Sequence, residues 1–334
     1  MSIWKFRAAP VIAAMIIFVT GCTAASTATF AALPGRAQQD ITVAAIPSVD
    51  LAGLYVAQDE GLFARQGLHV TIDKIASSAA VIADQLKGQV DISAGSYVAY
   101  ISAQAAGARF RILAEASTLA PNTRVLVTAA NSPVRTVAAL TRRKIGLNGT
   151  NSIGTLLVSA LLTARGISPR KVSFVTAPAG FPAMPGELRA GAWQAAFLAE
   201  PYITAAGQDY GEQVLADLDQ GAVVNLPIDG YLVTRAWARG HPKTAAAFVR
   251  AIEQGQAIAN GDALTVHAAM AKYDDLPPQV TAAIALTGYP VGPVVEAGIE
   301  RIATAMNQFG MLGRQDTTEA ERRTLVESMV GPGS

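Results

Sequence analysis

The sequence predicts an α/β protein built as two doubly wound lobes that are joined by a two-crossing hinge. Short apolar runs alternate with helical patterns over most of the chain, as they do in parallel βαβ units. This alternation occurs in two similar series, and a later strand pattern returns the chain to the first lobe. The 334-residue chain is also longer than one hydrophobic core usually supports. Together these observations favour two lobes over one.

The first series supplies one lobe. Residues 41–46 form an apolar run that Pro47 stops, which suits a buried parallel strand. We expect Asp50 to be the N-cap of the next helix, because residues at helical spacing follow it over 51–64. The rest of the series is predicted as strand 69–75, helix 77–87, strand 90–94, helix 97–106 and strand 110–116.

The second series and the C-terminal part follow the same logic. The second series is predicted as strand 124–128, short helix 136–140, strand 144–148, helix 152–164, strand 172–176, helix 184–190, strand 195–198 and helix 201–206. After it come a strand at 231–237 and helices at 243–260, 263–273, 277–286, 294–309 and 318–329. The predicted crossings lie near 117–122 and 222–229, which assigns residues 40–118 and 227–334 to the first lobe and 119–226 to the second.

The N-terminal segment carries a targeting pattern. Basic Lys5 and Arg7 precede an apolar stretch that is shorter than the roughly 20 residues of a membrane-spanning helix. The stretch ends in the phrase VTGC, whose last residue, Cys22, is the only cysteine. This phrase resembles the lipobox of bacterial lipoproteins and predicts a signal peptide over 1–21, a diacylglycerol on Cys22 and a flexible tether over 22–39. The alternative is an ordinary secretory signal followed by a stray thiol.

Composition limits the classes of partner. Removing the predicted signal peptide takes away Lys5 and Arg7 and leaves 24 basic against 25 acidic residues, so nucleic acid is not an expected partner. A single cysteine excludes an intrachain disulfide. Hydrophobic residues make up 51% of the chain and charged residues 15%, which indicates a well-buried globular body.

Several short phrases resemble one family of solute-binding proteins. In order they are YVA at 55–57, EGLF at 60–63, GL at 67–68, GQVDI at 88–92, KIG at 144–146 and EPY at 200–202. Their order and spacing resemble the SsuA/THI5-like family of nitrate-, sulfonate- and thiamine-precursor-binding proteins over residues 41–250. Gln194 departs from the pattern, since the family usually has aspartate there.

The resemblance implies a type II periplasmic-binding-protein-like fold, in which two lobes close on a small-molecule ligand. It also implies an ABC permease with a cytoplasmic ATPase as the partner that receives the ligand. With the lipid anchor, the protein is expected at the extracytoplasmic face of the cell membrane. We further expect a monomer without a cofactor or metal.

The ligand is expected at the carboxyl ends of the strands, where helix N-termini direct unpaired N–H groups outward. Loops at these ends supply the candidate residues. The predicted ligand-binding residues are Ser48, Asp50, Ser77, Ser78, Gly95, Ser96, Tyr97, Asn122, Asn148, Thr150, Asn151, Ser152, Phe181, Glu200, Tyr202 and Asp229.

Each residue type has a competing structural interpretation. The serines can cap helices instead of binding ligand, and the aromatic side chains can pack in the core instead of stacking on a planar ligand. The hydroxyl-rich loop at 149–155 lacks the lysine of a phosphate-binding P-loop. Asp50, Glu200 and Asp229 are the charged residues expected at the rim, which argues against arginine clamps. We therefore predict a small polar organic ligand, sulfonate-like or heterocyclic, that carries a donor or planar group.

Two other functions share this fold pattern. By resemblance, THI5-like pyrimidine-precursor enzymes rely on a histidine and a cysteine-rich segment. Here His69, His241 and His267 all lie outside the predicted cleft loops, and Cys22 is assigned to the anchor. No Gly-x-Ser-x-Gly or His-Glu-x-x-His motif occurs either, so the sequence favours a binding protein over an enzyme. A ligand-sensing adaptor of a membrane signalling protein would have the same lobes and anchor, and it stays open.

Overall fold

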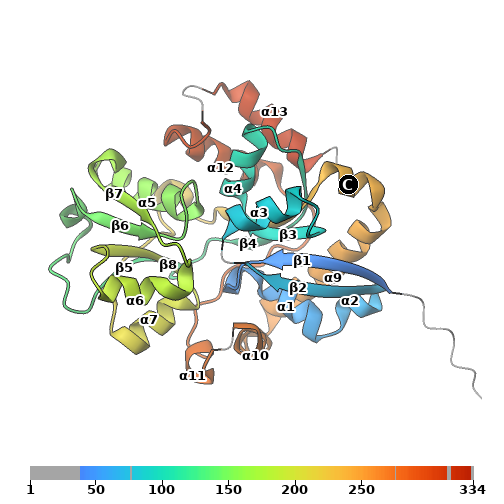
Figure 1. Cartoon of the computed structure of the whole chain (residues 1–334), viewed down its shortest axis with the longest axis horizontal. Coiled ribbons are helices and arrows are strands. Elements are labelled where there is room, and N and C mark those ends of the chain that lie inside the picture. Colours follow the sequence, from blue (N-terminus) through green and yellow to red (C-terminus); the bar gives the residue numbers. More distant parts are fainter. Residues whose placement is uncertain (1–37, 76, 275, 314–316, 332–334) are drawn as a thin grey trace, which may run out of the picture. The chain divides into compact units, whose positions relative to one another are not determined.

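The computed structural model contains two five-stranded sheets, each covered by helices (Figure 1). It describes residues 38–75, 77–274, 276–313 and 317–331. The first sheet has the order β2-β1-β3-β10-β4. Its strands are β1 (Gln39–Ala45), β2 (Leu68–Lys74), β3 (Ile92–Ser96), β4 (Phe110–Thr118) and β10 (Pro227–Thr234). The predicted signal peptide, Cys22 and the tether as far as residue 37 lie outside the described residues.

The second sheet repeats the plan of the first, with the order β7-β6-β8-β5-β9. Its strands are β5 (Arg124–Thr128), β6 (Lys144–Leu147), β7 (Ser173–Thr176), β8 (Ala195–Ala199) and β9 (Gln213–Asp217). In each sheet, one strand runs antiparallel to its neighbours, and it is the strand that arrives from the other lobe, β10 or β5. The prediction of purely parallel units is wrong for these two strands, because each enters its sheet at the edge where the neighbouring strands end.

Most predicted helices are present. The α-helices are α1 (Ala52–Asp59), α2 (Leu62–Arg65), α3 (Ser78–Leu86), α4 (Tyr97–Ala105), α5 (Ile153–Ala164), α6 (Met184–Arg189), α7 (Tyr202–Tyr210), α8 (Arg235–Gly240), α9 (Pro242–Gly261), α10 (Ala263–Asp274), α11 (Pro278–Thr281), α12 (Glu296–Gln308) and α13 (Glu319–Val330). The 3₁₀ turns are η1 (Val49–Leu51), η2 (Val137–Leu140), η3 (Pro169–Lys171), η4 (Phe181–Ala183) and η5 (Gly221–Val223). Within the described residues, no helix combines the length and apolarity needed to cross a membrane.

The structure corrects several predicted boundaries. The predicted helix 51–64 is divided into η1, α1 and α2, with a break at Gly61, whose φ is +64°. The predicted strand 231–237 begins earlier, at Pro227, and gives way to α8 at Arg235. Strand β9 was not predicted, because this edge strand is partly exposed and lacks a continuous buried apolar run.

The first lobe is held by close packing of α1 on α9. A side chain on Gly255 of α9 would place its Cβ 2.3 Å from the backbone oxygen of Gly53 in α1. Glycine at this position therefore lets the two helix backbones approach each other, and their buried faces join the apolar core of the first sheet.

The chain crosses between the sheets twice, over residues 119–123 and 218–226. Leu119 N donates a hydrogen bond to Leu226 O at 2.8 Å, so the two crossings are paired with each other. A third stretch lies beside them, because Thr118 N donates to Gly288 O at 2.9 Å. Backbone hydrogen bonds therefore join these three segments at one position, which borders the candidate site.

Candidate functional site

Three adjacent strands bring polar side chains together at the edge of the first sheet that faces the hinge. Asp229 of β10 is the cross-strand partner of Ser96 at the end of β3 and of Ser117 in β4. All three residues are buried. The register of β10 with β4 shifts on both sides of Asp229, and such bulges re-aim side chains at functional sites. Asp229 was predicted in a loop; the structure places it inside β10.

Most of the polar groups in this row lack partners. Among the described residues, Ser96 Oγ, Ser117 Oγ and the hydroxyl of Tyr97 make no hydrogen bond. The Tyr97 ring lies against the backbone next to Asp229, since a Cβ on Gly230 would come within 2.4 Å of the Tyr97 hydroxyl. Buried polar groups are nearly always satisfied, so an unsatisfied cluster of this kind requires an explanation.

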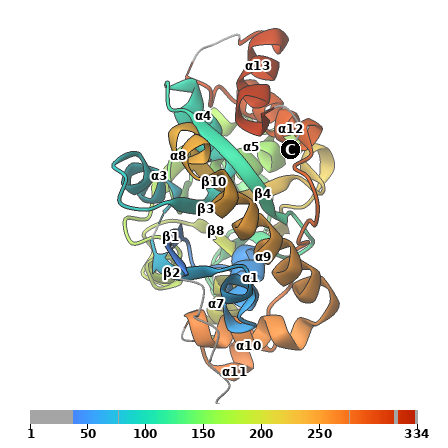
Figure 2. The same cartoon turned by 90° about the vertical axis from the view of Figure 1, so that its right-hand side faces the viewer.

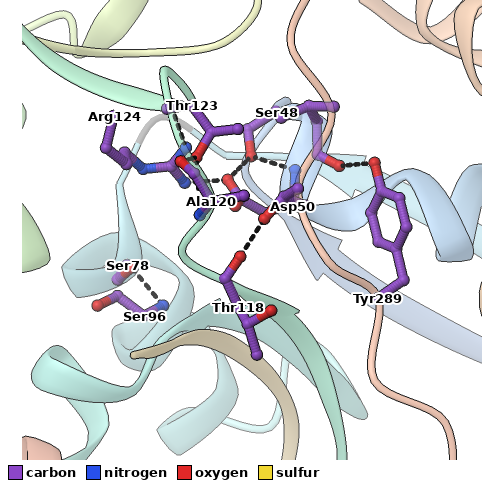
Figure 3. Close-up of polar contacts among 11 residues, drawn as sticks. Ser48, Asp50, Ser78, Ser96, Thr118, Ala120, Thr123, Arg124 and Tyr289 are labelled. Carbon is purple, nitrogen blue, oxygen red and sulfur yellow. Dashed lines mark hydrogen bonds and ion pairs between the residues drawn. The ribbon is translucent and has the colours of Figure 1, made fainter. Parts of the chain in front are cut away.

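An ion pair joins the two lobes beside this row. Arg124, the first residue of β5 in the second lobe, pairs through Nη2 with Asp50 Oδ2 of η1 in the first lobe (Figure 3). Both side chains are at least 97% buried. Ser48 Oγ donates to Asp50 Oδ2 at 2.5 Å, and Asp50 N donates to Ser48 Oγ at 3.2 Å. The predicted N-cap role of Asp50 is therefore wrong: Ser48 caps η1, and Asp50 holds the guanidinium.

The charges in this region do not balance. Burial and, to a smaller extent, the Asp50 carboxylate together raise the pKa of Asp229 to about 8, although the Arg124 guanidinium acts to lower it. Asp229 makes no hydrogen bond or ion pair with any described residue. Because Arg124 is already paired with Asp50, no cation among the described residues stabilises the ionised form of Asp229, and its carboxyl group is mostly protonated at neutral pH. The region therefore favours a group that donates hydrogen bonds or carries positive charge.

Arg124 corrects the charge argument made from the sequence. The sequence predicted only acidic residues at the rim of the cleft and argued against arginine clamps. Arg124 was missed, although its position at the start of a buried run directly after the hinge was an available signal. Ser117 was missed as well, and so was Tyr289, whose hydroxyl donates to Val49 O at 3.0 Å.

Two of the predicted serines in the first lobe have structural roles. Ser77 caps α3, since its Oγ accepts from Ala80 N at 3.3 Å. Ser78 Oγ accepts from Ser96 N at 3.2 Å and lies against Gly95, where a Cβ would come within 3.0 Å of it (Figure 3). The N-terminus of α3 is therefore fixed against the end of β3, and this contact positions Ser96.

The predicted ligand residues in and near the donor-rich loop of the second lobe differ in their surroundings. Ser152 caps α5 through Thr155 N at 3.4 Å, and Thr150 and Asn151 are exposed, with Asn151 at φ +47°. Asn148 is half-buried, and its Oδ1 has no hydrogen-bond partner among the described residues. Asn122, on the first crossing, is exposed at φ +63°.

A cavity separates the facing strand ends of the two lobes. It has a volume of about 210 Å³ and is lined by Ile46, Pro47, Lys74, Ile75, Phe181, Pro182 and Tyr202. The first four of these lie at or directly after the ends of β1 and β2, and the others follow β7 and β8. The Phe181 and Tyr202 rings stack on each other at a centroid distance of 5.7 Å, with 15° between their planes. These two aromatic residues therefore both pack together and border the interlobe space.

Glu200 differs from Asp229 because its carboxylate is fully engaged. It accepts from Thr204 N at 3.1 Å, from Thr204 Oγ1 at 2.8 Å and from Ala285 N at 3.2 Å. Burial raises the pKa of Glu200, while these hydrogen bonds and Arg124 lower it. Its backbone oxygen also accepts from Val49 N at 3.4 Å. Glu200 thus ties the second lobe to two segments of the first.

Comparison with known proteins identifies the family of this chain and its type of fold. A family model described as NMT1/THI5 like matches residues 48–262. The chain belongs to this family. A search of curated proteins finds no relative. The family and the two-lobe, type II periplasmic-binding-protein-like fold predicted from the sequence are confirmed.

Solved structures share the fold of this family member at low sequence identity. The periplasmic aliphatic sulphonate binding protein SsuA from Escherichia coli has a TM-score of 0.68 and 19% identity, covering 86% of this chain and 96% of that chain. The alkanesulfonate-binding protein SsuA from Xanthomonas axonopodis pv. citri, bound to MOPS, has a TM-score of 0.71 and 18% identity, with coverages of 85% and 96%. The periplasmic nitrate-binding protein NrtA from Synechocystis PCC 6803 has a TM-score of 0.74 and 15% identity, with coverages of 87% and 86%.

Proposed function

We propose that this protein is an extracytoplasmic solute-binding protein that captures a small polar organic molecule between its lobes and delivers it to an ABC importer. The observation that carries the proposal is the buried row of Ser96, Asp229 and Ser117 beside the hinge. The two serine hydroxyls have no hydrogen-bond partner among the described residues, and no described residue pairs with the Asp229 carboxyl. The family match and the solute-binding proteins of the same fold support it. Opening of the hinge admits the ligand, and closure of the lobes removes it from water.

The charges favour a ligand with hydrogen-bond donors, such as a protonated amine or an aminopyrimidine. The Asp229 carboxyl has no partner among the described residues, and Asp50 Oδ1 is a second free acceptor. A cationic donor would stabilise the ionised form of Asp229, whereas an oxyanion would bind only beside its protonated form, and the Arg124 charge is already compensated by Asp50. The Phe181 and Tyr202 rings at the interlobe cavity suit a planar ligand.

A thermal-shift screen over aminopyrimidines, amino acids, flavins, sulfonates and nitrate identifies the ligand class, because binding to the folded state raises Tm. Calorimetry then compares the wild type with Asp229→Asn and with the exposed control Asp209→Asn. We expect Asp229→Asn to weaken a cationic ligand by roughly ten- to a hundredfold, as the loss of a charged hydrogen bond does, and Asp209→Asn to have no effect. Tight binding of a sulfonate or nitrate that Asp229→Asn leaves unchanged would exclude the proposed ligand class.

Binding is proposed in preference to catalysis. His69 pairs with Asp40 at 2.8 Å, and His241 stacks on Trp237 at a centroid distance of 4.8 Å. His267 lies in α10. The histidines therefore lie away from the row that contains Asp229, and supply no proton-transfer group there.

Delivery to a permease and signalling predict different cell phenotypes. If the protein serves an importer with a cytoplasmic ATPase, deletion of its gene abolishes uptake of radiolabelled ligand at low concentration. If it serves a sensor, deletion leaves uptake intact and removes the transcriptional response to the ligand. Unchanged uptake in the deletion strain would exclude the importer role.

Membrane attachment through Cys22 is part of the same proposal. The VTGC phrase at the end of the apolar stretch supports cleavage before Cys22 and lipidation of its thiol. Intact-mass spectrometry of the membrane fraction should show a chain that begins at Cys22 and carries a diacylglycerol. A Cys22→Ser variant should lose this mass and leave the membrane fraction. An unmodified Cys22 in the mature chain would disprove the anchor.

A further inference from the structure

Two connected cavities lie in the first lobe, away from the interlobe cavity. The first, which we name the arginine pocket, has a volume of about 180 Å³ and is lined by Arg111, Arg235, Ala238, Arg239, Ser328 and Gly331. The second, which we name the apolar groove, has a volume of about 560 Å³. Arg111 and Ala238 line both cavities, so the two adjoin each other.

These cavities lie at the opposite end of the first sheet from Asp229. Arg111 is the second residue of β4 and pairs with Val233 near the end of β10, whereas Asp229 pairs with Ser117 near the other end of β4. Helices α8, α9 and α13 pack against β4 around this end (Figure 2). A ligand here would not occupy the interlobe site.

The arginine pocket concentrates positive charge without a counterion. Among the described residues, no carboxylate lines it, and none of its three arginines forms an ion pair. Arg235 Nη2 donates to Ser328 O at the end of α13, and this bond fixes its guanidinium at the pocket wall. Asp91, which contacts α8, is engaged by Trp237 Nε1 at 2.9 Å and by Thr42 N at 2.9 Å. Three arginine side chains around one pocket suit a phosphate or carboxylate head group.

The apolar groove begins where the arginine pocket ends. Its aliphatic lining includes Ile112, Leu113, Ala246, Val249, Val294 and Val330, and its charged members are Arg111, Arg250 and Glu253. Its volume lies within the usual range of small-molecule sites. A hydrocarbon chain in the groove would remove this apolar surface from water.

We propose that the arginine pocket and the apolar groove form one binding site for an anionic amphiphile with a single hydrocarbon chain. The guanidinium groups of Arg111, Arg235 and Arg239 hold the oxyanion head, and the groove holds the chain. Charge complementarity and the shared wall of the two cavities favour this occupant over a simple anion or a neutral lipid. The proposal does not depend on the ligand of the interlobe site.

Calorimetry with monododecyl phosphate below its micellar concentration tests the proposal on the mature protein. We expect one molecule to bind per chain. Arg239→Gln should weaken binding about tenfold, whereas the exposed control Arg143→Gln, with the same charge change in the second lobe, should have no effect. Ala246→Trp should block the groove and abolish binding, whereas Ala257→Trp, also exposed on α9 but outside the groove lining, should not. Both tested positions are exposed, so these variants should fold.

Other probes separate the alternatives. Inorganic phosphate and dodecyl maltoside should each bind at least a hundredfold more weakly than monododecyl phosphate. Equal binding of inorganic phosphate would disprove the role of the groove, and equal binding of the maltoside would disprove the role of the arginines. Tight binding of an acidic peptide that displaces monododecyl phosphate would identify a protein-docking face and overturn the proposal, as would no binding of monododecyl phosphate.

Discussion

Glu200 and Asp229 are buried carboxylates of opposite lobes that have opposite relations to their surroundings. Burial raises the pKa of both groups. The Glu200 oxygens accept three hydrogen bonds from Thr204 and Ala285, whereas Asp229 accepts none from the described residues. Folding therefore compensates the desolvation of Glu200 and leaves that of Asp229 largely uncompensated.

This difference separates a structural carboxylate from a binding one. Burial and a raised pKa are shared by both residues, so neither property identifies a ligand contact. The number of internal partners separates these two residues, because a protein that closes on its ligand must leave some buried groups for the ligand to satisfy. Glu200 therefore belongs to the fold, whereas Ser96, Ser117 and Asp229, which lie together beside the hinge, are available to the proposed ligand.

The largest expected effect concerns the Asp50–Arg124 ion pair, which engages the arginine that lies near Asp229. Arg124→Met leaves Asp50 buried without its cation and should lower the free energy of unfolding by about 3–5 kcal/mol. Urea denaturation followed by circular dichroism measures this change. The double variant Asp50→Asn/Arg124→Met should recover much of the loss, because no unpaired charge remains. A single variant as stable as the wild type would show that Asp50 is not held by Arg124.

The second effect is that the stability of the wild type and that of the Asp229→Asn variant depend differently on pH. Since the folded-state pKa of Asp229 is raised to about 8, the folded state binds more protons than the unfolded state between about pH 4 and pH 8. Protonation of Asp229 therefore contributes its full stabilisation below about pH 4. This part of the free energy of unfolding is lost as the pH rises to about 8, by at most about 1.4 kcal/mol per pH unit. Asp229→Asn should remove this slope and stabilise the protein most at high pH.

Two variants serve as controls for that measurement. Glu200→Ala should destabilise the protein at every pH by about 1–3 kcal/mol, because Thr204 N and Ala285 N lose their acceptor. Burial also raises the pKa of Glu212 to about 8, so Glu212→Gln measures its contribution to the slope in the same pH range. If Asp229→Asn left the pH profile of the wild type unchanged, Asp229 would not be the unpaired carboxylate that the comparison requires.

The sequence predicts local features better than long-range ones. Apolar runs predict most strands, including 41–46 and 195–198, because a buried strand consists largely of consecutive apolar residues. The antiparallel direction of β5 and β10 depends on the path of the chain between lobes, which no local pattern encodes. The Asp50–Arg124 pair joins residues 74 positions apart, so the sequence could suggest either member but not their contact. Likewise, Glu200 and Asp229 are both acidic residues near predicted strands, and only the fold shows which one has partners.

The smallest effect distinguishes two serines that look alike in the sequence. Ser77 caps α3, so Ser77→Ala should lower the free energy of unfolding by about 1 kcal/mol and leave ligand affinity unchanged. Ser117 Oγ has no partner among the described residues, so Ser117→Ala should leave stability unchanged or slightly increased. If the ligand satisfies this hydroxyl, Ser117→Ala weakens binding by about three- to tenfold, in line with one neutral hydrogen bond. Parallel denaturation and calorimetry of both variants measure the two quantities. A loss of stability in Ser117→Ala with unchanged affinity would place Ser117 with Glu200, among the residues that hold the fold together.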